Sequence, residues 1–335
     1  MNYLNKLLII LIFSVSFAHF QLIAKTITLE ETITLKYVSQ AKISPDGNHV
    51  AYTLVNPRIP YLDDDGSNYV ELHVTDINGN SRPFVTSKVN VSNVNWGPEG
   101  QYIYYTARRN DDKYTSIYRI PLDGGESVKV VSYGNSISSY SINNQSSTLV
   151  FIAKEPDPKH EESLKKKGFK AEIYEESDKF NHLFKVDLKT EGNKPEMVDI
   201  SENILSVEFS PINDLLLVRT TPTPKIDDSY TNSKYQIYDL SGQLKSSFNT
   251  EGKLGMASWS PKANHVAIIG AEDKNDPSAG RLFLGDIKDG KLTEYLKDYK
   301  GHVSNVGWTD DNNLVYIGQV NMTSEVGKIN INNRE

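Results

Sequence analysis

The densest group of side chains that could do chemistry is acidic. Asp63-Asp64-Asp65-Gly66-Ser67-Asn68 offers carboxylate and amide oxygens, the ligands that calcium prefers. A calcium loop of the helix–loop–helix type also needs a bidentate glutamate at its twelfth position, and counting from Asp63 that position is Val74. The segment therefore resembles a calcium loop only in part, and we expect an acidic turn.

Histidine and cysteine offer no metal site. The seven histidines stand at positions 19, 49, 73, 160, 182, 265 and 302, and none is spaced as His-x-His or His-Glu-x-x-His. The chain has no cysteine, which excludes a disulfide framework and a cysteine-linked lipid anchor. We expect no metal and no cofactor.

A short sequence motif occurs six times in the chain. It predicts the strands and turns that must position any functional site. The motif consists of an apolar residue, a turn similar to Ser-Pro-x-Gly, and a predicted strand. Its clearest copy is Ile43-Ser44-Pro45-Asp46-Gly47. From the Ser44 position the copies advance by 53, 46, 67, 50 and 49 residues, through Gly97, Asn143, Ser210, Ser260 and Thr309. Such a period indicates one small sheet per repeat.

The turn residues have a structural role in this interpretation. Proline fixes φ near −65° at the first turn position, and Asp, Asn or Gly supports the positive φ that follows. The residues assigned to this role are Ser44, Pro45, Asp46, Gly47, Gly97, Pro98, Ser210, Pro211, Ser260 and Pro261. The apolar residue before the turn recurs as Trp96, Phe209, Trp259 and Trp308, which we expect to pack between neighbouring repeats.

Each repeat predicts four antiparallel strands. Nearly continuous apolar runs such as Tyr102-Ile103-Tyr104-Tyr105 follow the turns, as expected for strands that are covered on both faces. A second hairpin follows most copies, with turn signals such as Asn78-Gly79 and Asp289-Gly290. Four-stranded units repeated about an axis make an all-β propeller, with a β-sandwich as the weaker alternative. The expected blades are 41–86, 91–131, 137–199, 204–249, 254–297 and an incomplete 302–335.

The N-terminus predicts secretion. Lys6 precedes an apolar run from Leu7 to Phe17, and small residues follow at Ala18 and Ala24, as in a signal peptide. We expect residues 1–24 to be the signal peptide and 25–335 the propeller, in the bacterial periplasm, with an uncleaved anchor as the alternative. The net charge of −7, from 36 basic and 43 acidic residues, argues against a nucleic-acid surface.

The spacing of 67 residues between the third and fourth copies of the motif is the longest, and it contains an insertion. Residues 155–167 are rich in charge and predict either a short solvated helix or a flexible loop, which carries recognition or is a plain surface excursion.

Several segments of this sequence that are longer than a single turn resemble a known protein family. The opening Thr28-Leu29-Glu30-Glu31 through Ser39, running into Ile43-Ser44-Pro45-Asp46-Gly47, is similar to the start of the N-terminal β-propeller of prolyl-oligopeptidase-family serine peptidases. Asp63-Asp64-Asp65-Gly66, Ile120-Pro121-Leu122-Asp123-Gly124-Gly125-Glu126 and the segment from Tyr174 to Asp187 resemble the dipeptidyl-peptidase and acylaminoacyl-peptidase branch. The resemblance covers nearly the whole chain after the signal peptide.

The resemblance implies a catalytic partner that this chain does not contain. In the family, the propeller restricts access to the serine triad of an α/β-hydrolase domain, whose nucleophile lies in Gly-x-Ser-x-Gly. Here Gly-x-Ser occurs at Gly79, Gly125 and Gly134 and never continues to glycine, so we assign no catalytic residue. Because the sixth repeat is short, we expect a fragment of a longer peptidase. A reduced six-bladed propeller is the alternative.

The resemblance also assigns one pair of site residues. Dipeptidyl peptidases of the family can hold the α-amino group of a substrate with paired glutamates, and Glu175-Glu176 is the matching pair. The match is imperfect, because the family pair precedes another Ser-Pro-x-Gly motif, whereas this pair precedes the His182-Leu183-Phe184 strand. A solvated charge pair is the plain alternative.

Two functions follow from these observations. The first is a substrate-gating propeller of a secreted serine exopeptidase that acts on short peptides, with peptide substrate as partner through the hydrolase domain. The second is a stand-alone, TolB-like or WD40-like periplasmic propeller that binds proteins. Neither requires nucleic acid, or a membrane after signal cleavage.

Overall fold

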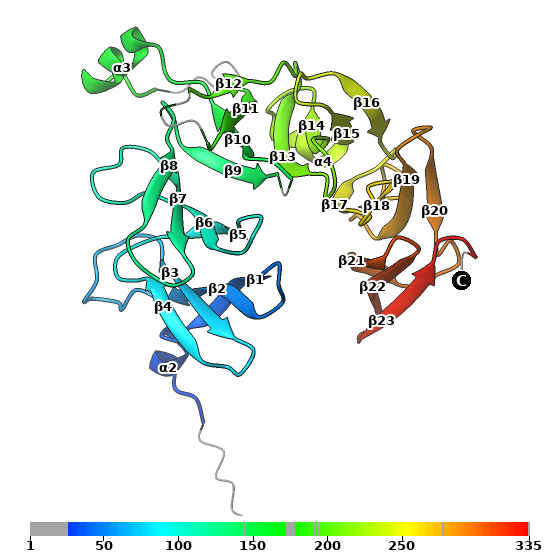
Figure 1. The fold of residues 1–335 in the computed structure, drawn as a ribbon, viewed down its shortest axis with the longest axis horizontal. Helices are drawn as coiled ribbons and strands as arrows, with labels where there is room; N and C mark the ends of the chain where they lie inside the picture. The colour runs from blue at the N-terminus through cyan, green and yellow to red at the C-terminus, as the bar shows by residue number, and fades with distance from the viewer. Residues whose placement is uncertain are drawn as a thin grey trace, which may run out of the picture.

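Six antiparallel sheets stand around a common centre in the computed structural model of the protein (Figure 1). The structure describes residues 26–143, 145–171, 178–189, 192, 194–276 and 278–333. The first five sheets have four strands each and the sixth has three, with neighbouring strands consecutive in the chain. The all-β propeller with six repeats predicted from the sequence is confirmed, including its shorter last repeat.

The strands follow the repeat in order. The first sheet contains β1(Tyr37–Ile43), β2(His49–Asn56), β3(Tyr69–Asp76) and β4(Ser81–Val85). The second contains β5(Ser92–Trp96), β6(Tyr102–Ala107), β7(Ser116–Pro121) and β8(Val128–Val131). The third contains β9(Ile137–Ile142), β10(Thr148–Lys154), β11(Asn181–Asp187) and β12(Glu196–Met197). The fourth contains β13(Asn203–Phe209), β14(Leu216–Thr221), β15(Lys234–Tyr238) and β16(Leu244–Phe248). The fifth contains β17(Leu254–Trp259), β18(His265–Gly270), β19(Arg281–Asp286) and β20(Leu292–Tyr295), and the sixth contains β21(His302–Asp310), β22(Asn313–Val320) and β23(Thr323–Asn330).

The first strand of each sheet lies nearest the centre, and the second strand is the most deeply buried. In Figure 1 the inner strands β1, β5, β9, β13, β17 and β21 border the central opening, and the sheets form an arc with the first and sixth at its two ends. In β6 the five residues from Ile103 to Ala107 are all buried, and β10 and β18 each contain a similar buried run. This burial on both faces explains the continuous apolar runs after the turns.

Five apolar clusters fill the seams between successive sheets. Each combines residues of two neighbouring sheets, as where Ala51 and Leu72 of the first sheet pack with Val94 and Trp96 of the second. The other four clusters join sheets two to three, three to four, four to five and five to six. The predicted packing of Trp96, Phe209, Trp259 and Trp308 between repeats is confirmed.

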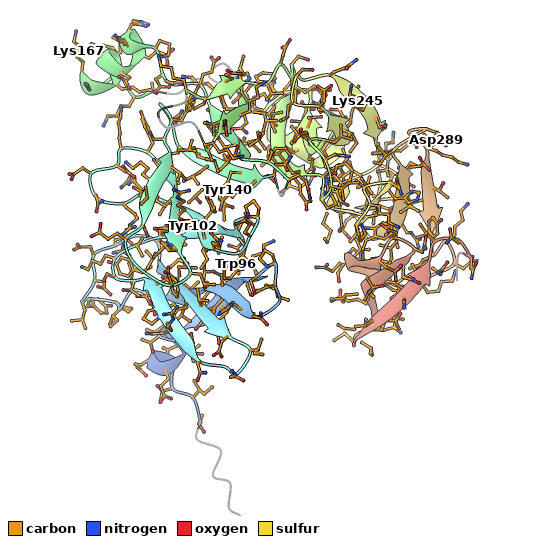
Figure 2. The ribbon with its side chains drawn as sticks, viewed as in Figure 1. Trp96, Tyr102, Tyr140, Lys167, Lys245 and Asp289 are labelled. Atoms are coloured by element: carbon orange, nitrogen blue, oxygen red, sulfur yellow. The ribbon has the colours of Figure 1, made fainter. Side chains whose placement is uncertain are left out.

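Polar groups of the inner strands tie the seams together. Trp96 Nε1 donates to the Lys42 carbonyl at 2.8 Å, and Trp308 Nε1 donates to the Ser258 carbonyl at 3.1 Å. At the seam between the second and third sheets, Tyr140 Oη donates to the Asn93 carbonyl at 2.7 Å. Figure 2 shows Trp96 and Tyr140 at successive inner positions of the arc. Each of these bonds fixes one sheet against the backbone of the sheet before it.

Within the described residues, three short helices lie outside the sheets. The helix α2(Leu29–Ile33) precedes β1 and begins with a capping box, in which Glu31 N donates to Thr28 Oγ1 and Thr28 N donates to Glu31 Oε2. The helix α4(Ile226–Thr231) lies between β14 and β15. Among the residues that the structure covers, no helix has the length and apolar character needed to cross a bilayer.

The insertion of the third repeat forms a helix, so the first of its two predicted conformations is confirmed. The helix α3(Lys159–Lys166) has no buried residue and extends away from the ring, with Lys167 near its far end (Figure 2). Its stem is held by Asp157, whose carboxylate pairs with Lys165 at 2.6 Å and also with Lys179. These two hydrogen bonds lower the pKa of Asp157 to about 2.

A pair of tryptophan variants should show what the seam hydrogen bonds contribute. Trp96 and Trp259 are equally buried, at 9% and 6% exposure, but Trp259 Nε1 has no hydrogen-bond partner within the described residues. We expect Trp96→Phe to lower the free energy of unfolding by about 1 kcal/mol more than Trp259→Phe, since only the first removes a hydrogen bond. Urea denaturation measures both variants, and equal losses would contradict the role of the bond.

Neutralising Asp157 should loosen the inserted helix. We expect Asp157→Asn to raise the rate of trypsin cleavage after Lys165, Lys166 and Lys167 several-fold at neutral pH, because Lys165 and Lys179 lose their common carboxylate. Because the pKa of Asp157 is depressed from 3.8, its contribution is complete above about pH 4 and is lost as the pH falls through about 2. The protection of residues 159–166 from hydrogen exchange, relative to the intrinsic exchange rate at each pH, should fall in that window.

The matched control is Asp298→Asn, which removes an exposed carboxylate from the segment between the fifth and sixth sheets. If both variants are cleaved after residues 165–167 as slowly as the unmodified protein, Asp157 does not hold the helix.

Candidate functional site

The repeat turns lie at the ends of the inner strands and close in the same way in the first five sheets. Ser44 N donates to the His49 carbonyl at 2.9 Å, Ser210 N to Leu215 at 2.8 Å and Ser260 N to His265 at 2.9 Å. Gly97 N makes the equivalent bond to Tyr102 at 2.8 Å, and Gly47 has the positive φ of 73° that its turn position requires.

The serine hydroxyls of these turns are used for local structure. Ser44 Oγ donates to Asp46 Oδ1 at 2.5 Å and accepts from His49 N at 2.9 Å. The bond from Ser44, followed by those from Asn48, lowers the pKa of Asp46 to about 2. Ser260 Oγ accepts from two backbone N–H groups, Asn264 at 3.1 Å and His265 at 3.0 Å. Hydroxyls committed in this way stabilise the turns.

Turns of successive sheets also contact one another. Asn143 Nδ2 donates to Asp214 Oδ1 at 2.6 Å, and Lys262 N donates to Asp311 Oδ1 at 2.6 Å. Two residues before Ser44 and Ser210, the inner strands carry Lys42 and Glu208. Glu208 keeps solvent access, yet burial by the surrounding sheets raises its pKa, and Lys42 partly offsets the rise. The two charges lie at the same position of the first and fourth repeats.

The acidic loop of the first sheet is occupied by an arginine. Arg58 Nη1 donates to the Asp64 carbonyl at 2.6 Å and Arg58 Nε donates to the Ser67 carbonyl at 2.8 Å. The Asp63 carboxylate accepts from Ile59 N at 2.8 Å. A guanidinium bound to the loop carbonyls takes the place where a cation would be held, which supports the acidic-turn interpretation. Among the described residues no cluster of histidine, aspartate or glutamate could hold a metal ion.

The predicted pair Glu175-Glu176 lies outside the described residues, so its role stays a prediction. Among the described residues, a cavity of about 500 Å³ lies at the base of the insertion. Glu155, Pro158, Glu161, Lys179 and His182 are among its lining residues. Lys179 is paired there with Asp157 and, at 3.6 Å, with Glu161.

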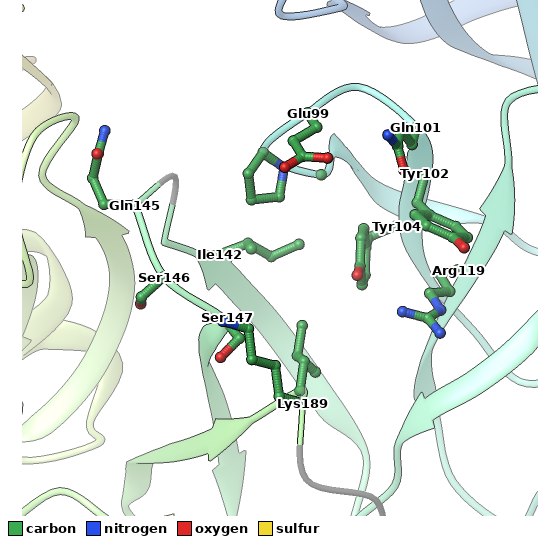
Figure 3. A pocket seen from close by; sticks show the side chains of 13 residues that line it. Glu99, Gln101, Tyr102, Tyr104, Arg119, Ile142, Gln145, Ser146, Ser147 and Lys189 are labelled. Carbon is green, nitrogen blue, oxygen red and sulfur yellow. The ribbon is translucent and has the colours of Figure 1, made fainter.

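Another cavity, of about 390 Å³, opens at the seam between the second and third sheets (Figure 3). Its apolar walls are Tyr102, Tyr104, Ile142 and Leu188, which belong to or pack against the cluster of that seam. Its charged lining residues are Glu99, Arg119 and Lys189, and Gln101, Gln145, Ser146 and Ser147 complete the rim. Arg119 lies over the Tyr102 ring, with its guanidinium carbon 4.6 Å from the ring centroid. We name this cavity the seam pocket.

Sequence reasoning did not identify the seam pocket. A usable signal was present, because Arg119 stands where the third strands of the first, fourth and fifth sheets carry the buried apolar residues Val74, Ile237 and Leu284. The third and sixth sheets carry Lys185 and Lys328 at this register. Seeing it requires the strand register, which the repeat motif alone does not provide.

The comparisons with known proteins agree with this architecture. Residues 30–153 match the family model described as prolyl oligopeptidase, N-terminal β-propeller domain. A comparison with curated proteins gives no match to this chain.

Solved structures share the fold at low sequence identity. Acylaminoacyl peptidase of Pyrococcus horikoshii is similar with a TM-score of 0.61 and 14% identity, over 89% of this chain and 45% of that one. A prolyl endopeptidase is similar with a TM-score of 0.60 and 13% identity, over 92% of this chain and 42% of that one. An oligogalacturonate lyase in complex with manganese has a TM-score of 0.58 and 12% identity, over 90% and 84% of the two chains.

These likenesses establish the propeller fold, and the lyase demonstrates that the fold serves unrelated chemistry. This chain spans less than half the length of either peptidase. Residues 30–153 are therefore similar in sequence to the N-terminal β-propeller domain of prolyl oligopeptidase, and the remaining sheets of the chain continue the same fold.

Proposed function

We propose that this propeller gates and selects substrates for a secreted serine exopeptidase that hydrolyses short peptides on an α/β-hydrolase domain. The observation that carries the proposal is the match of residues 30–153 to the prolyl oligopeptidase propeller domain. The similarity of fold to an acylaminoacyl peptidase and a prolyl endopeptidase is consistent with it. This chain contributes no catalytic residue in the proposal.

The physical basis of gating is the rigidity of the array of sheets. Successive sheets joined by buried clusters and by hydrogen bonds such as that from Trp96 to Lys42 resist separation, so a folded protein does not pass between them. A short, extended peptide is small enough to reach a catalytic site beside such an array. In the proposal, Glu175 and Glu176 hold the amino terminus of that peptide by charge-assisted hydrogen bonds.

Active-site labelling of the natural protein tests the peptidase proposal. Antibodies against this chain capture the natural product from the source cells after treatment with a fluorescent fluorophosphonate, which reacts with activated serines. We expect a labelled species of about twice the mass of this chain, because the chain covers 45% of the acylaminoacyl peptidase.

Pretreatment with an unlabelled fluorophosphonate should abolish the signal, which controls for nonspecific labelling. Captured protein of this chain's own mass and without label would overturn the peptidase proposal and favour the TolB-like binding module.

The proposed secretion has a separate test. We expect N-terminal sequencing of the mature protein to begin at His19 or Lys25, since the small residues Ala18 and Ala24 end the predicted signal peptide. Fractionation of a bacterial host should recover this species in the periplasm. A mature protein that keeps Met1 and sediments with membranes would instead indicate an uncleaved anchor.

A further inference from the structure

The seam pocket exists because two positions of the repeat differ at one seam. The residue before each turn packs on the preceding sheet, and it is aromatic at Trp96, Phe209, Trp259 and Trp308 but aliphatic at Ile142. Ile142 is only partly buried and lines the pocket. The other repeats with a preceding sheet have an aromatic residue at this packing position. The smaller side chain of Ile142 leaves space there, and Tyr104 borders that space.

The second difference supplies charge to that space. Arg119 pairs with Tyr104 across the strands β7 and β6, at the register where Val74, Ile237 and Leu284 are buried in other sheets. Lys185 is the equivalent residue of the third sheet, and its ammonium donates to the Leu240 carbonyl at 3.3 Å and lies 3.6 Å from Glu196. Within the described residues, Arg119 has no carboxylate partner. A cation placed at a core register without a counter-ion is available to an anion.

The remaining lining residues define the kind of anion. Lys189, which is exposed, adds a second cation, and Glu99 lies on the rim near the Pro98 turn. The pocket therefore carries one net positive charge, which suits a singly charged anion better than a phosphate dianion. Arg119 stacks on Tyr102, so its planar fork is held in one orientation and can bind the two oxygens of a carboxylate.

The walls define the rest of the ligand. Tyr102, Tyr104, Ile142 and Leu188 offer aromatic and aliphatic surface on the sides of the same cavity, and about 390 Å³ accommodates one large side chain with its backbone. We propose that the seam pocket binds the carboxylate of an apolar or aromatic ligand, as found in a small aromatic acid or at the C-terminus of a peptide ending in a large apolar residue. Arg119 holds the carboxylate, Lys189 adds positive charge on the side of Ser147, and the four wall residues hold the apolar group.

This inference goes beyond the proposed function. The pocket is built from the second and third sheets alone, so it does not depend on a hydrolase domain or on the Glu175-Glu176 pair. A failure of the peptidase proposal leaves the pocket unchanged, and a failure of the pocket leaves the gating proposal unchanged.

Titration calorimetry of the protein with N-acetylphenylalanine tests the inference. We expect saturable binding of the free acid and at least about 10-fold weaker binding of N-acetylphenylalanine amide and of inorganic phosphate, since the amide lacks the charge and phosphate lacks the apolar group. A peptide that ends in phenylalanine separates the two ligand sources. Equal affinities indicate a small-acid site, and tighter binding of the peptide indicates a C-terminal tail site.

Two variants locate the binding. Arg119→Gln should weaken binding of the acid about 10-fold or more, and Ile142→Trp should abolish it, because the indole fills the space as it does at the Trp96 seam. Arg82→Gln is the matched control, since Arg82 also lies over an aromatic ring, Phe84 at 5.0 Å, but is outside the pocket. A thermal unfolding transition shared with the unmodified protein shows that each variant is folded.

The inference is overturned if the acid does not bind saturably up to its solubility limit, or if acid and amide bind equally. It is also overturned if folded Arg119→Gln binds as the unmodified protein does, or if folded Ile142→Trp keeps its affinity.

Discussion

The contact of each inner strand with the sheet before it is the interaction on which the whole structure depends. A four-stranded sheet alone leaves two apolar faces in water, so each sheet is stable only when its neighbours cover them. In the second, fourth, fifth and sixth sheets the aromatic residue before the turn packs in the seam with the preceding sheet, and Trp96 and Trp308 also donate to the backbone of that sheet. The turns must hold the inner strands in register, and their serine hydroxyls form the hydrogen bonds that stabilise these turns.

That constraint also decides where the chain can vary. A seam that is stabilised by several independent contacts can lose one of them and stay closed. The seam between the second and third sheets keeps the hydrogen bond from Tyr140 to Asn93 and the buried cluster around Phe151. The aromatic residue at its turn end can therefore be replaced by Ile142 without opening the seam. The same seam accommodates Arg119 because the Tyr102 ring covers one face of the guanidinium.

The structural features that depend on adjacent residues could be predicted from the sequence alone. Ser-Pro-x-Gly turns, Asn-Gly hairpins and apolar runs are decided by a few adjacent residues, so the six repeats and the packing of Trp96, Phe209, Trp259 and Trp308 could be predicted. The seam pocket could not, because Arg119, Ile142 and Lys189 are brought together by strand register and by contact between sheets. The acidic loop is an intermediate case, because the Arg58 side chain, which comes from just before the loop, binds the loop carbonyls through a contact that the loop sequence itself does not reveal.

The dependence on neighbours has a consequence for the two ends of the arc. Ile43, the first-sheet counterpart of Trp96, is 71% exposed, and Ile317 and Val326 of the sixth sheet are exposed as well. The first and sixth sheets thus share one described seam each, whereas the four sheets between them share two. Stability in such an array is approximately a sum of unit and interface contributions, so the inner sheets are the best supported. A pocket with an unpaired arginine costs stability, and it lies at a seam where both sheets have a second neighbour to offset that cost.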